Sequence, residues 1–146
     1  MLKAMLGTTC LLLTFMSTSS ADVSQVRELA IVKAVDAPVF RKAREEDAPG
    51  CMTTRYTFGD EIIAMKLEFK CDRINVAWNT SMEPQNSLRS RHASHLAQRA
   101  VVALTQGNGI EVERVMDGGK YKGRTYSNNL LLSGSCFTNM CLLTFN

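Results

Sequence analysis

Small and apolar residues recur at helical spacing over one long segment of the chain. Between residues 87 and 106 they fall on a single helix face, and they are Ala93, Leu96, Ala97, Ala100, Val101 and Leu104. Asn86 or Ser87, which follow Pro84, can cap the start of such a helix, and the stretch 107–109 (Gly-Asn-Gly) can end it. The pattern therefore predicts a main helix over about 87–106.

Alternation of apolar and polar residues predicts strands before this helix. The segment 52–58 is rich in Thr and aromatic residues, and Gly59 and Asp60 are turn residues. A strict alternation follows, with Ile63, Met65, Leu67, Phe69 and Cys71 as its apolar set. A further apolar run, Ile74, Val76 and Trp78, is one residue out of phase. That shift indicates either a bulge near residues 72–73 or a turn into a new strand.

The chain after the main helix also has strand character. Residues 110–116 and 120–126 flank the turn sequence Asp-Gly-Gly at 117–119, which predicts a hairpin. Two further candidate strands, 130–133 and 142–145, are joined through the segment between Cys136 and Cys141.

The N-terminal third has weaker signals. Residues 22–35 favour a helix, with Val26, Leu29 and Ala30 at helical spacing. Basic and acidic residues neutralise each other within 41–47, which predicts a solvated loop or short helix. The order helix, strands, helix, strands indicates an α+β fold, in which one face of an antiparallel sheet packs on the main helix in a single domain over 22–146.

The first twenty-one residues have the pattern of a secretory signal peptide. Lys3 precedes an apolar run from Ala4 to Met16, which is too short to span a membrane, and Ser19 and Ala21 are small residues at the spacing that a signal peptidase requires. We expect a mature start at Asp22 and a secreted or periplasmic protein.

The cysteine count agrees with export. Cleavage removes Cys10 and leaves an even set in an oxidising compartment, namely Cys51, Cys71, Cys136 and Cys141. The last two enclose four residues, so a Cys136–Cys141 disulfide closes a hairpin-sized loop and Cys51 pairs with Cys71 by elimination. A metal site is the alternative, but the chain has no CxxC pair and its histidines do not have zinc-finger spacing; as a His-x-x-His pair, His92 and His95 would need further ligands from elsewhere.

The predicted Cys51–Cys71 pair carries a geometric condition. A tight two-residue turn at Gly59 and Asp60 would place Cys51 opposite Glu68, three positions short of Cys71. The pair therefore requires a wider loop around 60–62 or a bulge.

Composition excludes few kinds of partner. The 146 residues are 45% hydrophobic and 21% charged, which is typical of a globular domain, and a net charge of +3 is too small to indicate nucleic-acid binding. No later segment is apolar enough for a membrane span in the mature chain. We expect no cofactor, and a partner that is another protein or an anionic ligand.

The main helix carries the candidate binding site. Arg91, His95 and Arg99 form one stripe opposite the apolar face, with His92 beside it. We call these four residues the basic stripe. Such a cluster suits an anionic partner, and its positive potential grows as histidine protonates. An ordinary solvated helix face is the alternative interpretation.

Three function classes fit these observations. The preferred one is a small exported binding protein without catalytic activity, of the inhibitor, immunity or secretion-accessory type. The second is a small secreted hydrolase or nuclease that uses His92 or His95 with Arg91, Arg99 and an acid, Glu111 or Glu113, from a facing strand. The third is an envelope-assembly component, for which Val102 beside the stripe is a small hint.

Overall fold

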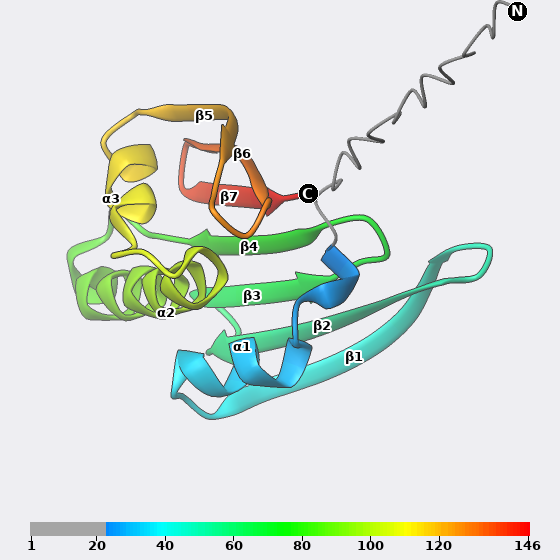
Figure 1. The fold of residues 1–146 in the computed structure, drawn as a ribbon. Coiled ribbons are helices and arrows are strands. Elements are labelled where there is room, and N and C mark those ends of the chain that lie inside the picture. Colours follow the sequence, from blue (N-terminus) through cyan, green and yellow to red (C-terminus); the bar gives the residue numbers. More distant parts are fainter. Residues whose placement is uncertain (1–22) are drawn as a thin grey trace, which may run out of the picture.

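A seven-stranded antiparallel sheet forms the centre of the computed structural model, which describes residues 23–146 (Figure 1). Its strands are β1 (Val39–Ala48), β2 (Cys51–Gly59), β3 (Ala64–Phe69), β4 (Ile74–Asn79), β5 (Lys120–Thr125), β6 (Leu131–Phe137) and β7 (Met140–Phe145). The order across the sheet is β1-β2-β3-β4-β7-β6-β5. The predicted signal peptide lies outside the described residues and stays a prediction.

Helices cover one face of this sheet. They are the short η1 (Val23–Gln25) and η2 (Pro84–Asn86) and the α-helices α1 (Glu28–Val35), α2 (Ser87–Thr105) and α3 (Ile110–Met116). The main helix α2 contacts β2, β3 and β4, and α3 contacts β5 and β6. The α+β class with one main helix is therefore confirmed.

The core lies between α2 and the alternate residues of the central strands. Phe58, Met65 and Trp78 are cross-strand neighbours on the covered face, and all three are fully buried. The apolar face predicted for α2 is buried against them. Of the two explanations for the phase shift before Ile74, the turn is correct, because β3 and β4 are separate antiparallel strands.

The other face of the sheet carries a row of polar side chains that crosses four strands. Arg55 on β2 donates to Glu68 on β3, Asn75 on β4 donates to the same carboxylate, and Thr144 on β7 donates to Asn75. Each pair is directly opposite in the strand register. We call these four residues the polar row. A solvated face with cross-strand hydrogen bonds is typical of an antiparallel sheet with one covered side.

Residues 41–47 form part of a strand, so the predicted loop or short helix is wrong. They belong to β1, which among residues 23–146 is an edge strand paired only with β2 and is exposed along almost its whole length. Figure 1 shows this hairpin extending past the helices at its tip. The turn is Pro49-Gly50, and Gly50 has a φ of 76°, which glycine adopts without strain. The strand lacks an alternating pattern because neither of its faces is buried.

Residues 110–116 are helical, so the predicted hairpin with 120–126 is also wrong. The buried residues of α3 are Glu111, Val112 and Val115, which is helical spacing, and β5 pairs instead with β6. Gly109 before the helix packs so closely on α2 that an added Cβ would lie 3.0 Å from Val102. The chain therefore enters α3 in close contact with α2.

The N-terminal helix is shorter than predicted and uses another face. Within the described residues α1 begins at Glu28, and it buries Ile31 and Val35 while Leu29 is exposed. Tyr56 on β2 donates a hydrogen bond of 2.7 Å to the Glu28 carboxylate. The start of α1 is thereby tied to the sheet.

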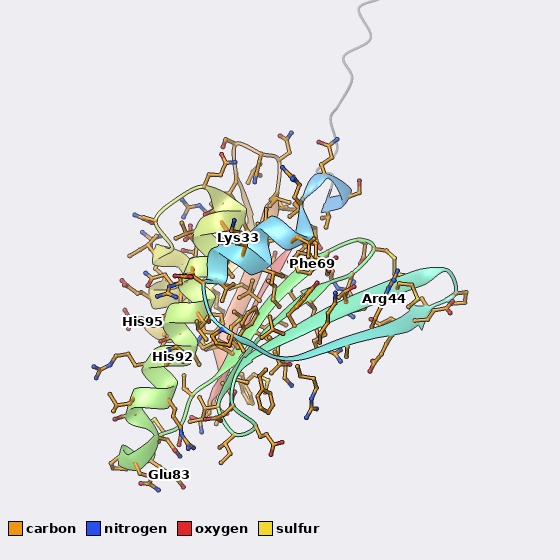
Figure 2. All side chains as sticks on the ribbon, turned by 90° about the horizontal axis from the view of Figure 1, so that it is seen from below. Lys33, Arg44, Phe69, Glu83, His92 and His95 are labelled. Carbon is orange, nitrogen blue, oxygen red and sulfur yellow. A yellow bond between two sulfur atoms is a disulfide. The ribbon has the colours of Figure 1, made fainter. Side chains whose placement is uncertain are left out.

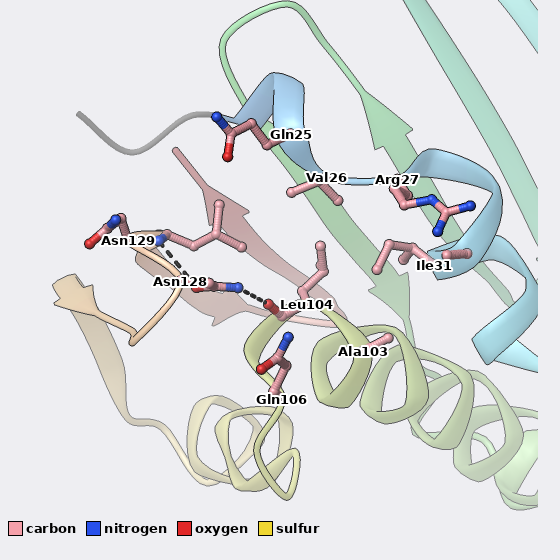
Figure 3. A pocket seen from close by; sticks show the side chains of 11 residues that line it. Gln25, Val26, Arg27, Ile31, Ala103, Leu104, Gln106, Asn128 and Asn129 are labelled. Carbon is pink, nitrogen blue, oxygen red and sulfur yellow. Dashed lines mark hydrogen bonds between the residues drawn. The ribbon is translucent and has the colours of Figure 1, made fainter. Parts of the chain in front are cut away.

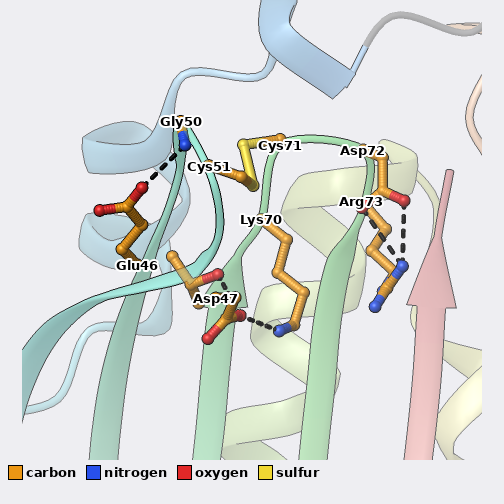
Figure 4. Close-up of a disulfide and its surroundings, with 9 residues drawn as sticks. Glu46, Asp47, Gly50, Cys51, Lys70, Cys71, Asp72 and Arg73 are labelled. Atoms are coloured by element: carbon orange, nitrogen blue, oxygen red, sulfur yellow. Dashed lines mark hydrogen bonds and ion pairs between the residues drawn. A yellow bond between two sulfur atoms is a disulfide. The ribbon is translucent and has the colours of Figure 1, made fainter.

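Both predicted disulfides are present. Cys51 and Cys71 have Cα atoms 5.8 Å apart, and the required wider loop is formed by residues 60–63. Figure 4 shows this disulfide where β2 begins and β3 ends, near the ion pair of Asp47 with Lys70. Cys136 and Cys141 are directly opposite on β6 and β7, which extend to the disulfide itself rather than ending before it.

Candidate functional site

The basic stripe is solvent-exposed along α2, as its helical pattern predicts. Arg91, His92, His95 and Arg99 are all exposed, and Figure 2 shows the two histidines on α2, about one turn apart. The four residues have different neighbours. Arg91 and His95 line hollows on the side of α2 that faces α3, whereas Arg99 contacts α1.

Arg99 has a structural contact that the sequence did not indicate. Its guanidinium donates to the main-chain carbonyl oxygens of Val35 and Asp36 at distances of 3.0 and 3.1 Å. These carbonyls lie at the C-terminal end of α1, where the helix leaves its acceptors unpaired and carries partial negative charge. Arg99 thus anchors the end of α1 to α2.

The first hollow lies between α2, the residues before it and the tip of the β6–β7 hairpin. Its volume is about 480 Å³. Apolar sulfur-bearing side chains make up part of its lining, namely Met82, Met116, Cys136 and Cys141. Arg91 and the hydroxyl residues Ser87, Ser90 and Thr138 also line it. We call it the disulfide hollow.

The second hollow adjoins the first between α2 and α3. Its volume is about 250 Å³, and it shares Ser94 and Met116 with the disulfide hollow. His95 and Gln98 line it from α2, and Glu113 and Asp117 line it from α3 and the residue after it. We call it the histidine hollow, and the two together the α2–α3 groove.

Serines on α2 leave the space that the groove occupies. Ser87, Ser90 and Ser94 follow one another at intervals of three and four residues, so these small side chains share one edge of the helix. The Ser90 hydroxyl accepts a hydrogen bond of 2.8 Å from the main-chain N–H of Ser81, which fixes the connection before α2. The N–H of Thr80 donates to the carbonyl of Asn139 and holds the hairpin tip against it. Hydrogen bonds therefore hold in place the two backbone segments that border the groove, the connection before α2 and the tip of the β6–β7 hairpin.

The two ends of the groove differ in charge. Among residues 23–146, neither Arg91 in the disulfide hollow nor Glu113 and Asp117 in the histidine hollow has an ion-pair or side-chain hydrogen-bond partner. The ion pairs of the described chain involve other residues, such as Arg89 with Asp60. Charged side chains without internal partners remain available to a ligand.

A buried carboxylate beside the groove was missed as a structural feature. Glu111 on α3 has a side chain that is only 3% exposed, and its Oε1 accepts a hydrogen bond of 2.7 Å from the Tyr126 hydroxyl. Burial raises the pKa of the Tyr126 hydroxyl, and the bond to Glu111 raises that pKa further. Arg124 lies 4.0 Å from the same oxygen and covers the rings of Tyr121 and Tyr126. This cluster ties α3 to β5. Of the two acids considered for catalysis, Glu111 is bonded to Tyr126, and Glu113 is the one that lines the histidine hollow.

A third hollow, of about 390 Å³, separates η1 and α1 from the end of α2 (Figure 3). Its polar lining is partly committed to the fold. The Asn128 amide donates 2.7 Å to the carbonyl oxygen of Leu104, and its carbonyl accepts from the N–H of Leu130. This hollow contains no residue of the basic stripe.

The chain matches no family model, no curated protein and no solved structure. The candidate site therefore stands on its own geometry.

Two further observations concern the described part of the chain. No helix in residues 23–146 combines the length and apolarity needed to cross a membrane. No group of three or more His, Cys, Asp or Glu side chains there is placed to hold a metal ion.

The sequence pointed to Arg91, to His95 and, as a candidate acid, to Glu113, but not to the methionines and serines of the groove. Met82 and Met116 come from segments distant in sequence from the hairpin tip, and no periodic pattern links them. The regular spacing of the three serines on α2 was the available signal.

Proposed function

We propose that this chain is a small exported binding protein without catalytic activity, and that the α2–α3 groove is its recognition site. Arg91 carries the proposal. It is an exposed cation without an internal partner in the described chain, and it lines a hollow in which methionines and a disulfide supply apolar surface. A ligand with an apolar group and a carboxylate would bury the apolar group in this hollow and pair the carboxylate with Arg91.

Methionine favours a site of this kind. Met82 is 86% exposed and Met116 is 44% exposed, and both border the disulfide hollow. Methionine side chains are flexible and polarisable, so they are common on surfaces that adapt to a partner. Hydroxyl groups along the edge supply hydrogen bonds that fix a ligand's orientation.

The two disulfides support the exported part of the proposal. Disulfides persist in oxidising compartments and are rare in reducing ones. Intact-mass measurement of the secreted protein should give a chain that begins at Asp22, and retention of residues 1–21 would contradict export by cleavage.

The second candidate function is hydrolysis, and one observation favours it. His95 and Glu113 line the same hollow, so a histidine and a carboxylate share one concave surface. A general base and its orienting acid require such a placement. Of the four basic-stripe residues first considered for catalysis, His95 alone lines this hollow; Arg91 lines the disulfide hollow, and Arg99 is bonded to α1.

Peptide selection tests the binding proposal. The full chain, purified from an exporting host, is used to select binders from a displayed library of random heptapeptides, and the tightest are synthesised and titrated by ¹H–¹⁵N NMR. We expect amide shifts at Ser87, Ser94 and Met116. We expect Arg91→Glu to weaken binding at least about fivefold, since reversal replaces attraction with repulsion.

Arg44→Glu is the matched control. Arg44 is exposed, has no ion-pair partner within residues 23–146, and lies on the β1–β2 hairpin far from His92 and His95 in Figure 2. Affinity should be unchanged in this variant. The proposal fails if the peptides shift amides elsewhere, or if both reversals weaken binding equally.

A substrate panel tests the hydrolase candidate. Chromogenic esters, phosphodiesters, glycosides and peptides are incubated with the wild-type protein and with His95→Ala. Turnover that falls by about 10² to 10⁴ in the variant would replace the binding proposal with catalysis. Turnover that is absent, or equal in both proteins, removes this candidate.

A further inference from the structure

The charged and apolar side chains of the α2–α3 groove are divided between its two hollows: Arg91 lines the disulfide hollow, Glu113 and Asp117 line the histidine hollow, and Met116 lines both. We infer that the ligand of this groove is an extended segment of a partner protein that carries an acidic side chain, then an apolar one, then a basic one. This inference rests on the proposed function and adds the chemistry of the partner.

The acidic position follows from Arg91. This side chain and the serine hydroxyls are the polar groups that α2 contributes to the disulfide hollow. A partner carboxylate can accept from the guanidinium and from a hydroxyl together, which is a charge-assisted arrangement.

The basic position follows from the other end. Glu113 and Asp117 both line the histidine hollow, and neither has an internal ion-pair partner among the described residues. A ligand with an acid at this end would meet two carboxylates, so a lysine or arginine is favoured there.

The apolar position lies between them. Met116 lines both hollows, and the Cys136–Cys141 disulfide borders the first. An aliphatic side chain of the partner that contacts this methionine and the disulfide removes apolar surface from water. Placed between the two charged positions, it leaves both of them free to form ion pairs.

Helix geometry sets the spacing of the two charges. Arg91 lines the disulfide hollow and Gln98 is the last residue of α2 that lines the histidine hollow, and at about 1.5 Å per residue these two positions on the helix are about 10 Å apart. An extended chain advances about 3.3 Å per residue, so about three residues cover this distance. The acidic and basic residues of the partner should therefore be two to four positions apart.

The heptapeptide selection is repeated with two variants as baits. The wild type should enrich peptides with the order acid, apolar, base at that spacing. Arg91→Glu should enrich peptides with a base in place of the acid, and the double variant Glu113→Lys/Asp117→Lys should enrich peptides with an acid in place of the base. Arg44→Glu should enrich the wild-type pattern.

Synthetic peptides make the result quantitative. In the selected wild-type peptide, replacing either charged residue by glutamine should weaken binding about two- to fivefold, the effect of one exposed charge pair. Folding of each variant is checked by the dispersion of its own NMR spectrum.

The outcomes separate the two claims. This inference is overturned if the selected peptides shift the groove amides but carry no acid–base pair, or if all baits select the same charge pattern. In either case the groove remains a binding site. If no selected peptide shifts the groove amides, the proposed function fails and the inference falls with it.

Discussion

Arg99 shows that one side chain on an exposed helix face can belong to the fold rather than to a binding surface. In the sequence Arg99 and Arg91 are equivalent, because one follows His95 by four residues and the other precedes it by four. Only the bonds to Val35 and Asp36 distinguish Arg99. We therefore expect its loss to change stability and not recognition.

Replacement of Arg99 by Met tests this role. The variant keeps the aliphatic stem but removes the hydrogen bonds to the α1 carbonyls, so the free energy of unfolding should fall by about 1 kcal/mol. His92→Ala, on the same exposed helix, should change it by less than about 0.5 kcal/mol. Urea unfolding at pH 7 measures both. Equal effects would show that the contact does not stabilise α1.

Gly134 on β6 is required by close packing. An added Cβ would overlap the carbonyl oxygen of Leu142 and lie 2.9 Å from the Cα of Leu143. We expect Gly134→Ala to lower the free energy of unfolding by about 1–3 kcal/mol, because backbone atoms must move to make room. Ser135→Ala at the next position should cost less than about 0.5 kcal/mol in the same denaturation experiment. Similar losses in the two variants would contradict the predicted overlap.

At the scale of elements, the two disulfides stabilise connections of very different length. The Cys51–Cys71 pair joins residues separated by 20 positions, and the Cys136–Cys141 pair joins residues separated by 5. In the chain-entropy model, the longer closed loop restricts the unfolded chain more strongly.

Double replacement by alanine should show this difference. Loss of Cys51–Cys71 should lower the free energy of unfolding by about 3 kcal/mol, and loss of Cys136–Cys141 by about 2 kcal/mol. Urea denaturation of the two double variants provides the comparison. A larger loss for the short hairpin would indicate that packing at the disulfide hollow, and not loop closure, dominates.

The α2–α3 groove belongs to this scale as well. It exists because α3 and the β6–β7 hairpin both lie beside the serine edge of α2. The histidine hollow is lined by residues of α2 and α3 and by Asp117, whereas the disulfide hollow also requires the hairpin tip and the residues before α2.

At the scale of the whole molecule, the polar row links four strands by charge and hydrogen bonds. Partial burial by itself would raise the pKa of Glu68, but hydrogen bonds from Asn75 and Arg55 outweigh it, and the pKa of this carboxyl lies below its usual value. The pKa of Asp47 is lowered by its hydrogen bond from Lys70, and the pKa of Asp60 by the main-chain N–H groups of Ile63 and Ile62. These carboxylates hold protons more weakly in the folded chain than in the unfolded one.

Acid should therefore destabilise the protein. Stability from these groups is fully present above the unfolded pKa, about 4, and is lost as the pH falls through the lower folded pKa values. The urea midpoint should decrease between about pH 4.5 and pH 3. Glu68→Gln should reduce this decrease, and the exposed Glu61→Gln should follow the wild-type curve. A midpoint independent of pH in this window would contradict the prediction.

Elements with a buried face of their own were predictable from the sequence. The apolar positions of α2 and the alternation in β3 indicate which side of each element faces the core. The number and spacing of the cysteines predicted both disulfides. These signals are local because periodicity follows directly from helix and strand geometry.

The tertiary structure decided the features whose environment comes from distant segments. β1 is a strand only because β2 pairs with it, and its two exposed faces leave no alternation to detect. α3 is a helix because it packs on α2 and buries Glu111 beside Tyr126, whereas its short sequence also suits a strand. The same reason gives the residues of the basic stripe different neighbours: α1 accepts the hydrogen bonds of Arg99, while Arg91 and His95 stay exposed and line hollows beside α3. The periodicity of a helix shows in its own sequence which of its faces is buried. Which elements pack against that helix depends on the tertiary structure of the whole chain.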